Sequence, residues 1–146
     1  MPLSYFVNFV KRKTYIGVGE LVGAVGAFYT LPELFRGRKV IHFVDNAGAL
    51  SHMVNGYAGQ PDSARLVNAF HVAIMALEMS WYGEWVPSKA NPADIMTRPE
   101  RFEELRQALA GCHVEWHDYE LPPLSISSQP LIDWARRMRV AGGRAR

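Results

Sequence analysis

The sequence has a single cysteine, Cys112, so no disulfide can form within the chain. Its twelve glycines follow no regular period, which excludes a collagen-like fibre. With 49% apolar residues and a net charge of only +2, the chain also lacks the low hydrophobicity and high charge of disordered proteins. What remains over 146 residues is the composition of one globular domain with its own hydrophobic core.

A hydrophobic run of full membrane-spanning length is also lacking. The most apolar stretch, Tyr15–Leu31, has 17 residues, contains Glu20 and is followed directly by Pro32, whereas a span needs about 20 residues. Four apolar residues recur there at helical spacing: Leu21, Val25, Phe28 and Leu31. We expect a buried helix, and a small membrane protein spanning 15–31 is the alternative. The N-terminus lacks the cleavage pattern of a secretory signal, which predicts an intracellular protein, in the cytosol or in an organelle.

Basic residues are concentrated towards both ends, although the net charge is small. Acids outnumber bases from Glu100 to Glu120, and no acid stands among the arginines that close the chain. Such basic clusters attract phosphate groups, although most charge clusters in proteins are simply solvated surface. The basic residues that we take as candidate nucleic-acid contacts are Lys11, Arg12, Lys13, Lys89, Arg136, Arg137 and Arg139.

Strand and helix patterns alternate along the rest of the chain. The segment Lys39–Val44 is β-branched and aromatic without polar alternation, which is typical of a central strand covered on both faces. It ends at Asp45 and Asn46, where α/β folds place polar chemistry. A short helix closed by Asn55 and Gly56 is expected next, followed by a helix that is capped by Asp62 and buried through Leu66, Phe70, Ala73 and Leu77. A strand is expected at Trp81–Val86, and helices are expected to start at Asn91 and Thr97, the second of which reaches Ala110. The remaining expected elements are a short strand at His113–His117, a proline-rich connector at Leu121–Pro130 and an amphipathic helix at Leu131–Val140.

Three carboxylates lie in or between these elements. Glu20 falls in the first helix, Asp45 ends a strand and Asp94 starts a helix. Each can have an ordinary structural role: on a polar helix face, in a turn and as a helix cap, respectively. From the residues alone, a shared metal site and three separate structural roles both stay open.

Three segments together resemble a known family. Residues 19–27, 37–49 and 85–94 are similar, in order and spacing, to the ribonuclease H domain of retroelement reverse transcriptases. The most specific matches are Phe-Val-Asp45-Asn46 and Val-Pro-Ser-Lys-Ala-Asn-Pro-Ala-Asp94. The resemblance implies a five-stranded sheet flanked by helices, in which carboxylates hold two Mg²⁺ ions that cut the RNA strand of an RNA/DNA hybrid. It assigns Glu20, Asp45 and Asp94 as catalytic metal ligands and places Asn46 near the substrate backbone.

Two departures from this family bear on activity. The family's first aspartate has no counterpart, because none of the residues before Glu20 is acidic, and Pro87–Lys89 replaces a loop that often holds a histidine. The first strands of the family's sheet are also missing. We therefore expect an α/β protein with a partial ribonuclease H-like fold, a mixed sheet flanked by helices, over residues 1–99. Residues 100–146 would form a C-terminal helical extension, with a helix, the proline-rich connector and an arginine-rich helix and tail.

Two functions are consistent with these features. One is a degenerate, retroelement-derived domain without activity of its own, retained as a structural or nucleic-acid-contacting subunit beside other protein chains, for example in a ribonucleoprotein. The other is a Mg²⁺-dependent endonuclease that cuts RNA/DNA hybrids once another segment supplies the missing aspartate. RNA or an RNA/DNA hybrid is a candidate ligand in both, the subunit would also contact other protein chains, and no small-molecule substrate is expected.

Overall fold

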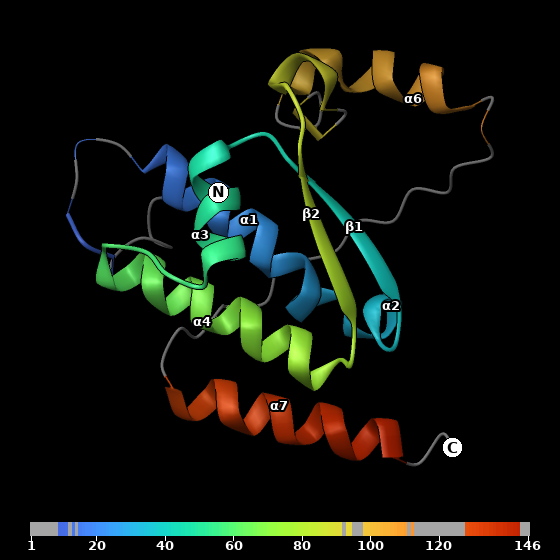
Figure 1. The fold of residues 1–146 in the computed structure, drawn as a ribbon. Coiled ribbons are helices and arrows are strands. Elements are labelled where there is room, and N and C mark those ends of the chain that lie inside the picture. The colour runs from blue at the N-terminus through green and yellow to red at the C-terminus, as the bar shows by residue number, and fades with distance from the viewer. Residues whose placement is uncertain are drawn as a thin grey trace.

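The computed structural model describes residues 9–11, 13, 15–91, 93–94, 98–110, 112 and 128–143. This part of the chain is mostly helical with two parallel strands, so the α/β class is confirmed (Figure 1). The elements are α1 (Ile16–Thr30), α2 (Pro32–Phe35), β1 (Lys39–Val44), α3 (Ala47–Asn55), α4 (Pro61–Ala76), β2 (Ser80–Trp85), the 3₁₀ turns η2 (Ser88–Ala90) and η3 (Pro99–Arg101), α6 (Phe102–Ala110) and α7 (Ser128–Gly143).

Helix α4 forms the centre of the hydrophobic core. It packs between α1 and α7, as Figure 1 shows. The apolar stripe expected for this helix is confirmed as buried: Leu66, Phe70, Ala73 and Leu77. The predicted cap is wrong, because Gln60 is the N-cap and Pro61 takes the first helical position, where its missing N–H costs nothing. Asp62 lies at the next position, inside the helix.

Helix α1 confirms the expected buried helix. Leu21, Val25 and Phe28 are buried, and the helix ends at Thr30 because Pro32 follows and starts α2. In the part of the chain that the structure describes, no helix has the length and apolarity needed to cross a membrane.

The two strands pair in parallel, with Lys39 opposite Ser80 and Val44 opposite Trp85. Helices α3 and α4 make the crossover that parallel strands require. The expectation that β1 is covered on both faces is wrong. Exposed and covered residues alternate along it, because the helices pack on only one side of the sheet: His42 contacts the Phe28 ring, whereas the flanking Ile41 and Phe43 are exposed.

The last helix belongs to the same core. It begins at Ser128, three residues before the predicted start, because residues 128–130 of the expected connector are helical. Leu131 is buried, and the Trp134 ring lies 4.2 Å from the ring of Tyr29, centroid to centroid. Helix α6 lies apart from it, beyond the carboxyl ends of the strands (Figure 1). The predicted strand at 113–117 and Thr97 are outside the described residues.

Candidate functional site at the end of strand β1

Asn46 joins three elements at the carboxyl end of β1. It is the N-cap of α3, and its Oδ1 atom accepts a hydrogen bond of 2.9 Å from the backbone N–H of Ala49. Its Nδ2 atom donates to Oε2 of Glu20, on the first turns of α1. Both ends of the Asn46 amide are therefore engaged within the chain, and they hold α1 against the β1–α3 junction.

Asp45 directly precedes this asparagine and is half-buried. Its backbone oxygen accepts a hydrogen bond of 3.3 Å from Nε1 of Trp85, the last residue of β2. Since Glu20 bonds to the neighbouring Asn46, the structure brings two of the three predicted carboxylate residues to one end of the sheet.

Asp94 is held by a different set of contacts. It follows η2, and Oδ1 of Asn91 accepts a hydrogen bond of 3.1 Å from the N–H of Ala93, which agrees with the predicted capping role of Asn91. The Asp94 carboxylate pairs with Arg98 at 3.0 Å, four residues further along the chain. Pro92 lies outside the described residues.

A metal ion needs several ligand side chains grouped around one point. Among the residues that the structure describes, no three His, Cys, Asp or Glu side chains are grouped so that they could hold a metal ion. The Glu20 carboxylate instead faces an amide donor. The donor set therefore does not fit the two-ion site that the resemblance implies. Magnesium stays a prediction from the resemblance.

The predicted nucleic-acid contacts form separate basic surfaces. Lys11, Lys13 and Lys89 are exposed, and Arg12 is outside the described residues. Arg136, Arg137 and Arg139 are exposed on α7.

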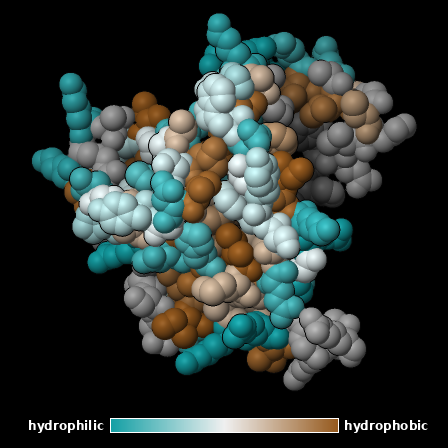
Figure 2. Space-filling view, in the orientation of Figure 1, coloured by the Kyte–Doolittle hydropathy of each residue, from teal (hydrophilic) through white to brown (hydrophobic). Residues whose placement is uncertain are grey.

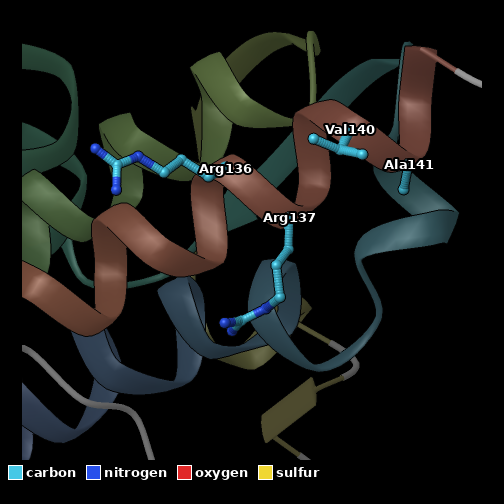
Figure 3. Close-up of a pocket in the computed structure, with 4 residues that line it drawn as sticks. All are labelled: Arg136, Arg137, Val140 and Ala141. Carbon is cyan, nitrogen blue, oxygen red and sulfur yellow. The ribbon is translucent and has the colours of Figure 1, made fainter.

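A shallow surface pocket on α7 is lined by Arg136, Arg137, Val140 and Ala141. Figure 3 shows the two arginine side chains pointing away from one another, and Arg136 lies 3.7 Å from Asp133. These arginines spread positive charge along the helix and do not converge on one small anion.

Sequence reasoning missed one buried carboxylate. Asp62 is 2% exposed and accepts hydrogen bonds from the backbone N–H groups of Val10, at 2.9 Å, and Ser63, at 2.7 Å. It thereby fastens the segment around Lys11 to the start of α4. No local pattern could have shown this, because the Val10 contact spans 52 positions.

It also missed the exposed aromatic residues of the sheet. Phe43 and Tyr82 lie on the side of the strands away from the helices. The Tyr82 hydroxyl donates to Oε2 of Glu84 at 3.0 Å, and this bond raises the pKa of Tyr82. In the sequence, only the alternation of residue types along Ser80–Trp85 could have indicated that one face of this strand is exposed.

In comparisons with known proteins, no family model, no curated protein and no solved structure matches this chain.

Proposed function

We propose that this chain is a ribonuclease H-like, retroelement-derived domain that does not cut nucleic acid by itself. It serves as a structural subunit of a larger assembly and contacts nucleic acid there. The observation that carries the proposal is the bond between Asn46 and Glu20, which joins two residues of the resemblance at the end of β1.

The same bond supports a role without catalysis. A two-ion mechanism needs carboxylate oxygens that are free to bind Mg²⁺. Here Oε2 of the Glu20 carboxylate accepts a hydrogen bond from the Asn46 amide, and the Asp94 carboxylate pairs with Arg98. Both acids thus have structural partners, and Asn46 also caps α3. The bonds of Asn46 to Glu20 and Ala49 stabilise the junction of α1, β1 and α3.

The sheet supports a role as a subunit. In the described part of the chain, β1 and β2 pair only with each other, so each strand leaves one edge of backbone N–H and C=O groups without a strand partner. Two-stranded sheets are marginally stable alone. A strand from another polypeptide can pair with such an edge and extend the sheet.

The nucleic-acid contact is supported by α7. Its exposed arginines lie along one helix that is fixed to the core through Leu131 and Trp134. In addition, Nη1 of Arg36 donates to the backbone oxygen of Met138 at 2.7 Å. Guanidinium groups spread over an anchored helix suit a phosphate backbone better than a single small anion.

A cleavage assay tests the absence of activity. The purified chain is incubated with an end-labelled RNA/DNA hybrid and Mg²⁺, and we expect no cutting above background. The control is Asp45→Asn, which should behave identically. Cutting by the wild type that Asp45→Asn abolishes would overturn the proposal and favour the endonuclease.

A salt titration tests the contact through α7. The affinity for the hybrid is measured against salt for Arg137→Gln/Arg139→Gln and for the matched control Arg65→Gln/Arg106→Gln, which also removes two exposed helical arginines. The α7 variant should lower the slope of log K against log[salt] by roughly 1.8, and the control should leave it unchanged. Equal slopes for the two variants would refute the contact.

A further inference from the structure

In the described part of the chain, one face of the sheet is not covered by any helix. We call it the open face, and it consists of the outward positions of the two strands: Lys39, Ile41, Phe43, Ser80, Tyr82 and Glu84. Three of these are large apolar or aromatic residues that are more than half exposed: Ile41 (65%), Tyr82 (61%) and Phe43 (58%). Figure 2 shows brown and pale residues, which are hydrophobic or of intermediate hydropathy, at the surface where the strands lie.

The strand register determines how the rings of Phe43 and Tyr82 lie relative to one another. Ile41 is opposite Tyr82, and Phe43 is opposite Glu84, so Phe43 and Tyr82 are diagonal neighbours. Diagonal neighbours in a sheet are roughly 7–8 Å apart. The two rings are therefore adjacent but separate, and each can take a planar partner of its own. Trp85 lies beyond Glu84 at the end of β2.

Basic residues lie at both ends of this face. Lys39 and the exposed Arg38 are at the amino end of the strands, and the exposed Lys89 follows β2 in η2. At the outward positions of β1 and β2, both of which are described in full, Glu84 is the single acid, and Tyr82 donates a hydrogen bond to it. Aromatic rings between flanking cations match the chemistry of a single nucleic-acid strand, in which bases stack and phosphates carry the charge.

We propose that the open face binds single-stranded nucleic acid, with bases stacked on Phe43 and Tyr82 and phosphates near Lys39, Arg38 and Lys89. The proposal rests on the nucleic-acid-contacting role proposed above and assigns it a second surface, distinct from α7. A duplex keeps its bases stacked internally, so the face discriminates against it. Ile41 supplies apolar contact without a stacking surface.

Fluorescence anisotropy with labelled 12-nucleotide oligouridine, oligodeoxythymidine and a duplex of the same length tests this surface. We expect both single strands to bind more tightly than the duplex. Tyr82→Leu should weaken single-strand binding by about 5- to 150-fold, because leucine keeps the apolar bulk and removes the ring. Tyr57→Leu is the matched control, since Tyr57 is 71% exposed but lies between α3 and α4, off the sheet. It should change the affinity by less than about twofold.

Three further variants test whether the rings bind by stacking and whether the phosphates pass near Glu84. Phe43→Leu should weaken binding as Tyr82→Leu does, whereas Phe43→Tyr should keep it. Glu84→Gln should tighten binding by up to about fivefold, because it removes a carboxylate from the path of the phosphates. Thermal unfolding of each variant checks that the fold is retained.

Three outcomes would overturn the proposal. They are duplex binding as tight as single-strand binding, leucine variants that bind like wild type, and loss of binding by Tyr57→Leu equal to that of Tyr82→Leu. If only the α7 arginine variant loses affinity, the open face fails while the proposed function stands. If sedimentation shows wild-type dimers that Phe43→Leu and Ile41→Ser dissociate, and no oligonucleotide binds, the face is a protein interface.

Discussion

Gly83→Ala and Gly23→Ala add the same methyl group, and the structure predicts opposite effects on stability. A Cβ atom on Gly83 would lie 2.4 Å from Cη2 of Trp81 and 2.6 Å from Cδ1 of Leu50. Carbon atoms in contact are normally about 3.5–4.0 Å apart. Both side chains, or the backbone, must therefore move before an alanine fits at position 83.

The surroundings of Trp81 resist that movement. Its ring centroid is 4.8 Å from that of Phe70, a residue with no exposed surface. Its Nε1 atom donates to Nδ1 of His42 at 3.4 Å. Shifting the indole ring would disturb both contacts, so we expect Gly83→Ala to lower the free energy of unfolding by about 1–3 kcal/mol. For a chain of this size, the corresponding fall in Tm is roughly 3–10 °C.

Gly23 provides the matched control. It lies in the interior of α1, it is exposed, and a Cβ atom there would meet nothing within 4 Å. Alanine in a helix interior is more favourable than glycine by about 0.5–1 kcal/mol, since glycine loses more backbone entropy on folding. Gly23→Ala should therefore raise the free energy of unfolding.

Urea unfolding followed by circular dichroism and tryptophan fluorescence measures both variants, with the midpoint compared at constant m-value. In a Trp81→Leu background, the cost of Gly83→Ala should shrink, because the ring that it meets is gone. Wild-type stability in Gly83→Ala would show that Trp81 does not lie over Gly83. Destabilisation by Gly23→Ala would show that this face of α1 is covered.

Three other predictions concern two hydrogen bonds and the half-buried His42. Asn46→Asp keeps the cap of α3 but sets a second carboxylate against Glu20, so it should lower the free energy of unfolding by about 1 kcal/mol, and adding Glu20→Gln should restore it. Tyr29→Phe removes the hydroxyl that donates to the backbone oxygen of Ala69 at 2.7 Å and should cost about 1 kcal/mol in urea unfolding. Burial lowers the pKa of His42, so its stabilising contribution is present above its unfolded pKa of about 6.5 and is lost as the pH falls through the lower folded value. The free energy of unfolding should fall less between about pH 7 and pH 5 in His42→Gln than in wild type, and equal slopes would refute this assignment.

The helices could be predicted because their apolar residues recur with the helical period. Phe28 in α1 and Phe70 in α4 both fall on such stripes and are buried. The faces of β1 could not be predicted, because the outward-facing Ile41 and Phe43 are as apolar as the inward-facing Val44. The pattern of a strand shows only which residue types lie on each face. The exposed face of β1 has the apolar composition that is typical of a buried face.

The candidate site was predictable only in part, for a related reason. The position of Asp45 at a strand end follows from the strand pattern alone. The bond between Asn46 and Glu20 joins residues 26 positions apart, and the Val10–Asp62 bond joins residues 52 positions apart. Local propensity carries no information about such pairs, since they form only when the helices pack.

The unpaired edge of the sheet and its open face would bind a partner through different groups. Edge pairing uses the backbone N–H and C=O groups of β1 in the plane of the sheet, whereas the rings of Phe43 and Tyr82 stand on its face. A strand added at the edge leaves the rings exposed, and a nucleic-acid strand on the face leaves the edge free. The two partners therefore need not compete, and one small chain can hold a protein and a nucleic acid together. This matches the proposed role as a structural subunit, for example in a ribonucleoprotein, and that role requires no catalysis from Glu20, Asp45 or Asp94.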